Sequence, residues 1–351
     1  MEVKYGKPYD KDMFRIKQGL YDENDRLLSD ALETLHIYSE QPFRTHCKLC
    51  GKKLPLKKCF SNRGIDFAYC EHCHHLNGFH EETVDFCLKV IENSGAVYKE
   101  PDVDAFEKRL KTIYLPKMDF LLEHLQSDGK KESRDIKILD VGAGSGYFVG
   151  AGLQRNVDII GVEASAEQVE LGNRMLRTKV LRQVDILDAK QCVAETSCNV
   201  VTFIGVLEHL DDLRAMLRTI QKNDNIEYIF FSVPLFSFSC VFAAVFPNVY
   251  NRQFGGGHTH LFSLDSIHYM NEEYGFEPVA AWQFGADAMD MFRSIMVTLG
   301  NENSQLRDIF SEHFLLCSDK IQLLFDKSGF SSEIHMLVRK KKSGTDVSVS
   351  K

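Results

Sequence analysis

The chain has 351 residues, of which 44% are hydrophobic, 11% aromatic and 26% charged, a composition that is ordinary for a globular protein with a buried core. Its net charge of −8 argues against a broad nucleic-acid-binding face, because such faces need clustered Lys and Arg. The N-terminus lacks an apolar segment of signal-peptide length and no apolar run is long enough to cross a bilayer, so we expect a cytoplasmic protein without membrane contact.

Two C-x-x-C pairs lie in the N-terminal part of the chain: Cys47 with Cys50, and Cys70 with Cys73. Pairs at this separation are typical of a zinc ribbon, in which two turns each present two thiolates to one tetrahedral ion. Because four thiolates fill the tetrahedron, we expect structural Zn²⁺ with no position open to substrate. Nearby histidines stay open as substitute ligands, namely His46, His72, His74 and His75.

Composition and periodicity divide the chain into segments. Residues 1–45 are expected to form an N-terminal lead with one amphipathic helix, 46–85 the zinc ribbon, and 86–130 a helical connector with apolar residues at helical spacing. Residues 131–340 are expected to form the main α/β core, with a helical insertion at about 286–329, and residues 341–351 are expected to form a flexible tail.

A glycine-rich turn at 135–149 is the strongest motif of the core. An apolar run of β type ends in Asp140, and three alternate glycines follow it, Gly142, Gly144 and Gly146. Glycines at a strand-to-helix turn allow positive φ and let a ligand lie against the backbone, while the next helix offers unpaired N–H groups. The dinucleotide fingerprint G-x-G-x-x-G does not fit this spacing, so the turn is predicted to hold another ligand.

Three further strand ends follow in order. The run 157–162 ends in Glu163, whose carboxylate we expect to accept hydrogen bonds from ribose hydroxyls, because alternating β and α units bring strand ends to one crevice. Asp185 is the acid at the next strand end, and Asp188 is a competing candidate for the acid at this strand end. The run 199–206 then leads into Glu208 and His209.

These motifs resemble those of the class I S-adenosylmethionine-dependent methyltransferases. The first motif of that superfamily reads hydrophobic-hydrophobic-Asp-hydrophobic-Gly-x-Gly-x-Gly, as 138–146 does here, and the V-L-E-H-L segment at 206–210 resembles its fourth motif. The resemblance implies S-adenosyl-L-methionine as cofactor and a doubly wound, Rossmann-like α/β sheet of seven strands, the seventh antiparallel, preceded by the zinc-ribbon and helical module. It also implies that Asp185 and Ile186 hold the adenine edge. The predicted cofactor-binding residues are Asp140, Gly142, Ala143, Gly144, Gly146, Glu163, Ala164, Asp185, Ile186 and Gly205.

Methyl transfer to a hydroxyl or an acidic carbon also needs a general base, and His is suited to that role near neutral pH. One candidate is His209, whose alternative role is to orient its loop. The other candidates lie in a glycine-rich segment at 249–262, which contains Tyr250, Arg252, His258 and His260. Polar groups that converge in a glycine-rich loop beside a rigid sheet are typical of functional sites.

The stretch H-x-H-L-F-S-L-x-S-I, which begins at His258, resembles a segment of methyltransferases that act on ubiquinone precursors and on nucleotide-linked sugars. The ribbon fused before the core is similar to that of the sugar C-methyltransferases, which methylate a ketosugar carbon after base-catalysed enolisation. This resemblance covers about 45–340 and implies His260 as the first choice of base, His258 as the second, and Tyr250 as an assisting group. Three glycines, 255–257, stand where that family has a bulkier, acid-containing stretch.

We therefore expect a methyltransferase that acts on a small molecule, a nucleotide-linked sugar or polysaccharide precursor. O-methylation of a phenolic or sugar hydroxyl is the alternative among small acceptors. An RNA or protein methyltransferase that uses the ribbon for recognition is the third hypothesis, favoured by one basic cluster: Lys48, Lys52, Lys53, Lys57 and Lys58.

Overall fold

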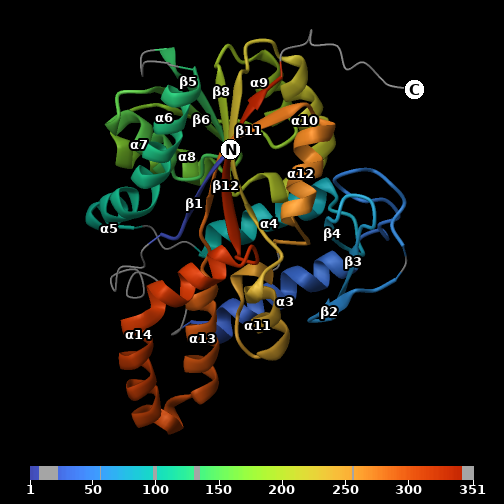
Figure 1. Ribbon diagram of the computed structural model, residues 1–351, viewed down its shortest axis with the longest axis vertical. Helices are drawn as coiled ribbons and strands as arrows, with labels where there is room; N and C mark the ends of the chain where they lie inside the picture. Colours follow the sequence, from blue (N-terminus) through green and yellow to red (C-terminus); the bar gives the residue numbers. More distant parts are fainter. Residues whose placement is uncertain (8–22, 56, 98–100, 130–134, 255–256, 342–351) are drawn as a thin grey trace.

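The computed structural model is an α/β fold built on an eight-stranded sheet, with a smaller four-stranded sheet beside it (Figure 1). The structure describes residues 1–7, 23–55, 57–97, 101–129, 135–254 and 257–341. Residues 8–22 of the predicted N-terminal lead and nearly all of the predicted tail at 341–351 lie outside the described residues.

The large sheet has the strand order β1-β11-β12-β9-β8-β5-β6-β7. Strands β5 to β9 pair in parallel, whereas β12 is antiparallel to both of its neighbours. Seven of the strands therefore form the predicted doubly wound sheet, including its antiparallel last strand. The strands span Glu2–Tyr5 (β1), Lys137–Val141 (β5), Asp158–Glu163 (β6), Leu181–Gln183 (β7), Val200–Ile204 (β8), Tyr228–Pro234 (β9), Phe276–Gln283 (β11) and Glu333–Lys340 (β12).

The eighth strand, β1, is not expected from the sequence. It pairs in parallel with β11 at the edge of the sheet, with Glu2 opposite Ala280 and Tyr5 opposite Gln283. Lys4 places its ammonium group 4.1 Å from the ring centroid of Trp282. The start of the chain, expected to be part of a polar lead, thus extends the sheet by one strand.

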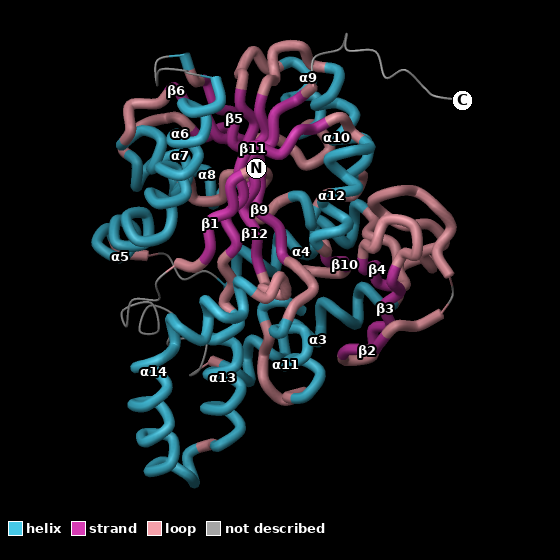
Figure 2. Tube along the Cα trace, in the orientation of Figure 1, coloured by secondary structure: helices cyan, strands magenta, loops and turns pink. Residues whose placement is uncertain are grey.

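Helices cover both faces of the sheet (Figure 2). The two faces bury separate hydrophobic clusters, one around Phe148 and Phe230 and the other around Phe203 and Phe231. The first cluster contains residues of α5 (Val103–Arg109), the π-helical turn η1 (Leu110–Tyr114), α6 (Leu115–Gly129), α7 (Tyr147–Gln154) and α8 (Ala166–Leu176). The second contains residues of α9 (Ala189–Glu195), α10 (Leu213–Lys222) and α12 (Leu264–Glu273).

The small sheet has the order β10-β4-β3-β2 and contains the predicted ribbon. Its strands are β2 (Phe60–Asn62), β3 (Ile65–Tyr69), β4 (Leu76–Gly78) and β10 (His260–Leu261). Because β10 comes from the core, the two modules share this sheet. The helices α3 (Asn24–Ser39) and α4 (Val84–Val97) pack beside it, in a cluster that joins Tyr38 and Phe86 to Leu261.

The remaining helices follow β8 in the sequence. They are η3 (Leu207–His209), between β8 and α10, then α11 (Phe238–Val245), η4 (Arg252–Phe254), α13 (Asp287–Leu299), η5 (Asn301–Asn303) and α14 (Ser304–Lys327). In Figure 1 α13 and α14 form a hairpin that extends away from the large sheet. Within the described ranges, none of the helices combines the length and apolarity that crossing a bilayer requires.

Candidate active site

The glycine turn after β5 has the backbone that its sequence predicts. Gly142, Gly144 and Gly146 all have positive φ, at 69°, 53° and 77°. A Cβ on Gly142 would lie 2.6 Å from Cγ2 of Val206, whereas a Cβ on Gly144 would meet no atom within 4 Å. The turn is therefore packed tightly against the end of β8 at one glycine and is open at the next.

Glu163 at the end of β6 is tied to this turn. Its Oε2 accepts a hydrogen bond from the backbone N–H of Gly144 at 2.8 Å, and its Oε1 accepts one from the N–H of Ser165 at 2.9 Å. The backbone N–H groups of Gly142 and Ala143 donate to the carbonyl of Val162 at 2.9 and 3.0 Å. The ends of two adjacent strands and the turn thus form one rigid unit.

Asp140, at the foot of the turn, is buried. The hydroxyl of Thr202 on the neighbouring strand β8 donates to its Oδ1 at 2.5 Å. Burial raises the pKa of this carboxyl to about 7, although the Thr202 hydrogen bond acts in the opposite direction. Asp140 therefore links β5 to β8 directly beneath the glycine turn.

A cavity of about 520 Å³ opens at these strand ends, within the range of small-molecule sites. Most of the predicted cofactor residues line it: Asp140, Gly142, Ala143, Gly144, Glu163, Ala164, Ile186 and Gly205. Gly146 and Asp185 do not. Gly146 begins α7, and the exposed Asp185 carboxylate instead accepts a hydrogen bond from the N–H of Leu187 at 2.9 Å.

One wall of the cavity is aromatic and comes from the helical connector. Phe106 and Tyr114 stack on Tyr147, with ring centroids 4.3 and 5.1 Å away, and the guanidinium of Arg109 lies 4.9 Å from the same ring. Arg109 and Tyr114 both line the cavity. Arg109 directly precedes the π-helical turn η1, and Tyr114 is the last residue of that turn. Such turns recur at functional sites, yet nothing in the periodicity of this segment distinguishes one from an ordinary helix.

The N-terminal module closes another side of the cavity. Glu82, Phe86, Cys87 and Val90 from this module line it. The Glu82 carboxylate accepts hydrogen bonds from Lys48 at 2.7 Å and from Arg44 and Thr259. Burial alone would raise the pKa of Glu82, but Lys48 and Arg44 outweigh burial and hold it at about 2.

A polar cluster stands where β8 ends. Glu208 and His209 line the cavity, and His258 lies against both of them. The ring centroids of His209 and His258 are 5.1 Å apart, and Nε2 of His258 lies 4.0 Å from Oε1 of Glu208. Burial raises the pKa of Glu208 to about 8 and lowers the pKa of His209 to about 4 and that of His258 to about 3.

The structure separates the other two predicted catalytic residues from this cluster. His260 lies in β10, fully buried, and its Nδ1 is 2.8 Å from Nε2 of His75 in the ribbon. Tyr250 lies under the guanidinium of Arg293, 5.4 Å from its ring centroid. Neither residue lines the cavity. His260, expected as the first choice of base, therefore does not reach the cavity in this structure, because strand pairing with β4 turns its ring toward the ribbon.

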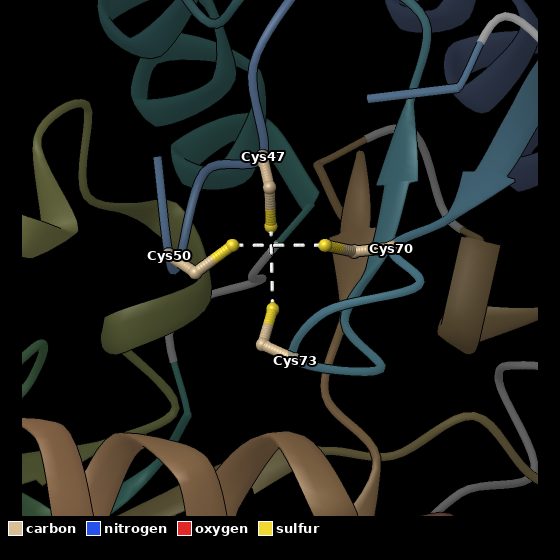
Figure 3. Close-up of side chains that lie close together, drawn as sticks. All are labelled: Cys47, Cys50, Cys70 and Cys73. Carbon is tan, nitrogen blue, oxygen red and sulfur yellow. Dashed lines mark hydrogen bonds between the residues drawn. The ribbon is translucent and has the colours of Figure 1, made fainter. Parts of the chain in front are cut away.

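The four predicted metal-binding cysteines converge (Figure 3). The sulfur atoms of Cys47 and Cys73 are 3.5 Å apart, those of Cys50 and Cys70 are 3.6 Å apart, and all four lie within 4.8 Å of one another. A tetrahedral site with Zn–S bonds of about 2.3 Å has sulfur–sulfur distances of about 3.8 Å. The residues therefore fit a zinc ion. His46, His72, His74 and His75 are not part of this cluster.

Glu208 lines the cavity but is not among the site residues that the sequence predicts. The sequence pattern includes it only as a member of the V-L-E-H-L segment, although a carboxylate beside a histidine at a strand end is itself a signal. The proximity of His258 to this pair could not be inferred from the sequence, because it depends on how β10 docks onto the ribbon.

A mostly parallel sheet with a glycine turn and a strand-end acid beside a cavity is the architecture in which doubly wound α/β proteins bind nucleotide-like ligands. The chain belongs to the methyltransferase domain family, whose model matches residues 106–281, half of its length. No curated protein matches the chain.

Several solved structures are similar to this one. The plantazolicin methyltransferase BamL is 13% identical with a TM-score of 0.45, over 73% of this chain and 93% of that one. The magnesium protoporphyrin IX methyltransferase of Synechocystis PCC 6803 is 12% identical with a TM-score of 0.44, over 73% and 96%. The methyltransferase domain of a bacterial Hen1, CtHen1-C, is 14% identical with a TM-score of 0.40, over 65% and 98%.

Proposed function

We propose that this enzyme transfers the methyl group of S-adenosylmethionine to a small acceptor, a nucleotide-linked sugar or a polysaccharide precursor. The observation that carries the proposal is the cavity itself, which joins the glycine turn and Glu163 on one side to Glu208 and His209 on the other. A cofactor held at the first side would present its methyl group toward the second.

The chain's own residues fit the cofactor. The open Cβ position of Gly144 leaves room against the backbone, and Glu163 offers a carboxylate for ribose hydroxyls. Ile186 and Ala164 supply apolar surface on the same wall. The cofactor would supply a methyl group on a positively charged sulfur, whose C–S bond breaks as the acceptor's electron pair forms the new bond.

The acceptor is proposed to be activated at the group formed by Glu208, His209 and His258. Removal of a proton from a hydroxyl or an acidic carbon supplies the electron pair for attack. Glu208 and His209 line the cavity, and His258 lies against them. His260 has instead a structural role in this proposal, in which it contacts His75 across the two modules.

The size and lining of the cavity support a small acceptor. The cavity measures about 520 Å³, and Phe86, Val90, Pro101 and Ala105 contribute apolar lining. The rival RNA hypothesis rested on the basic cluster 48–58, but Lys48 is buried in an ion pair with Glu82 and Lys58 lies 3.4 Å from Asp66. The sugar assignment itself is supported by the resemblance of the ribbon and of the segment at 258–267.

Zinc in the ribbon is proposed to be structural. The four sulfur atoms occupy every position of a tetrahedron and none of the four cysteines lines the cavity. The ion would hold β3 and β4 in place, and through them β10 and the segment that carries His258.

The test is a mass-spectrometric search for products heavier by one methylene unit, with S-adenosylmethionine and a panel of nucleotide-linked keto- and hydroxy-sugars. Glu163→Ala should weaken cofactor binding in calorimetry by at least about tenfold, because a hydrogen bond to a charged group contributes about 1.5 kcal/mol or more. Glu167→Ala, an exposed carboxylate on α8, is the matched control and should bind like the wild type.

Two results would count against the proposal. Cofactor binding without methylation of any sugar would remove the sugar assignment and direct the search to phenolic acceptors. Equal binding by the wild type and Glu163→Ala would show that the cofactor does not occupy this cavity.

A further inference from the structure

The group of Glu208, His209 and His258 has an arrangement that proton transfer alone does not explain. One ligand-type atom from each residue lies within 4.8 Å of the other two: a carboxylate oxygen and two imidazole nitrogens. Glu208 and His209 are neighbours in η3, and His258 joins them from a distant segment of the chain that the ribbon holds in place through β10.

Each histidine ring is already fixed through a backbone group. Nδ1 of His258 lies 3.2 Å from the carbonyl oxygen of Gln253, and the ring of His209 hydrogen-bonds with the backbone of Gly257. A histidine that binds a metal ion almost always donates its other ring N–H to a carbonyl or carboxylate, which fixes the tautomer. Both rings therefore carry the outer-shell contact that metal ligands carry.

Glu208 adds an independent observation. The side chain is 3% exposed, and among the described residues its Oε2 has no hydrogen-bond partner. A carboxyl group buried without a partner is costly to ionise, and a bound cation offsets that cost. Glu208 also lines the cavity in which an acceptor would bind.

The distances suit a single ion. Ligands about 2.1 Å from one metal ion lie between about 3 and 4.2 Å from each other, depending on the angle between them. The 4.0 Å between Nε2 of His258 and Oε1 of Glu208 falls in this range. The three ligand atoms, all within 4.8 Å of one another, are thus close enough together to be considered ligands of one ion.

We propose that Glu208, His209 and His258 bind a divalent transition-metal ion, at a site separate from the four cysteines. Two imidazoles and one carboxylate suit ions such as Zn²⁺, Fe²⁺, Co²⁺ or Mn²⁺, whereas four thiolates select Zn²⁺. Three protein ligands leave coordination positions open, which is the pattern of catalytic rather than structural metal sites.

The ion deepens the proposed function, on which this step rests. It would stand at the end of β8, next to Val206, which packs against the glycine turn at Gly142. Its open positions would face the cavity and take an oxygen of the acceptor. The acceptor class is therefore one that presents a hydroxyl or carbonyl oxygen at or next to the methylated atom, as nucleotide-linked hydroxy- and keto-sugars do.

The test uses the full chain with zinc already bound in the ribbon, titrated with Mn²⁺ and followed by electron paramagnetic resonance. The wild type should bind one Mn²⁺ per chain. His258→Ala and Glu208→Gln should each weaken that binding by at least about tenfold, the lower bound for loss of even an outer-shell partner. His268→Ala is the matched control, because His268 and Glu272 form an exposed pair 3.2 Å apart that any adventitious ion would find equally well.

A second probe covers metals that Mn²⁺ does not represent. Co²⁺ at the proposed site should give weak visible bands without the sulfur-to-cobalt charge transfer that a thiolate site produces. If neither Mn²⁺ nor Co²⁺ binds beyond the ribbon, or if His268→Ala alone loses binding, the metal proposal is wrong.

Calorimetry with S-adenosylmethionine on the same samples separates the two proposals. Cofactor binding without a second metal ion would leave the proposed function standing and remove the metal site. Binding of a second metal ion without cofactor binding would leave the metal site standing and remove the proposed function. Retained cofactor binding in His258→Ala and Glu208→Gln would also show that the variants are folded.

Discussion

Asp140 is a single carboxyl group that the fold keeps protonated at pH values at which an exposed aspartate is ionised. It is buried at the end of β5, next to Thr202, and burial raises its pKa from 3.8 to about 7. In the folded protein the group therefore keeps its proton to a higher pH than in the unfolded chain. The stability that it contributes is fully present below about pH 3.8 and is lost as the pH rises through about 7.

Asp140→Asn should remove this pH dependence. The free energy of unfolding of the variant, relative to that of the wild type, should rise by up to about 4 kcal/mol between pH 4 and pH 8, since each pH unit of a pKa difference corresponds to about 1.4 kcal/mol. Urea unfolding at several pH values, without cofactor, measures the difference. Asp158→Asn, an exposed carboxylate on the neighbouring strand β6, should follow the wild type. Parallel curves for the wild type and Asp140→Asn would contradict the prediction.

At the scale of elements, the ribbon and the core are joined by strand β10. His260 and Leu261 come from the core, yet they pair with Asn77 and Leu76 of the ribbon. The metal cluster lies at the two turns that precede β4, and Asn77 also contacts Cys47, with its Nδ2 3.5 Å from the sulfur. Loss of the metal should therefore also disturb the positions of residues outside the ribbon, namely His258 and its neighbours.

Cys70→Ser should lose the metal ion of the ribbon and expose residues 46–85 to protease, because binding of structural zinc supplies much of the folding free energy of such small modules. Metal analysis and limited proteolysis measure both effects. Cys59→Ser removes an exposed cysteine that lies between the two pairs but outside the cluster, and it should behave like the wild type. A Cys70→Ser protein that keeps its metal and its protease resistance would show that the cluster does not hold the ion.

At the scale of the whole molecule, the sequence predicts the structure correctly where a local residue pattern by itself implies how distant segments are arranged. Buried strands such as 138–141 and 200–204 are mostly apolar, and a parallel sheet brings their ends together, so the positions of the glycine turn and Glu163 follow from the amino-acid pattern alone. The two C-x-x-C pairs are informative for a similar reason, because metal ligation imposes a spacing on the chain.

The parts that escaped prediction depend on partners distant in the chain. His258 and His260 alternate and could both face one way in an extended segment, but β10 begins at His260, so only the second ring turns into the ribbon. Likewise β1 is short and largely exposed, with no apolar alternation of its own. It becomes a strand because it pairs with the free edge of β11, and no residue pattern near residue 2 predicts this pairing.

That eighth strand gives a prediction about the assembled fold. Trp282 is the one tryptophan of the chain, it is 2% exposed, and its Nε1–H donates to the carbonyl of Gly6 at 3.2 Å. Lys4 covers its ring, and the N–H of Gly6 donates to the carbonyl of Gln283 at 3.0 Å. The docking of β1 therefore controls how much water reaches the indole.

A chain that lacks residues 2–6 should show red-shifted tryptophan fluorescence and a lower melting temperature, because the indole and the edge of β11 become exposed together. Lys4→Gln is the comparison that keeps the strand and removes the charge. It should leave the fluorescence maximum nearly unchanged and cost about 0.5–2 kcal/mol of unfolding free energy, the contribution of a cation over an aromatic ring. If the truncated chain kept the fluorescence and melting temperature of the full chain, β1 would not be a stable strand of the sheet, and the seven-stranded arrangement expected from the sequence would describe the protein in solution.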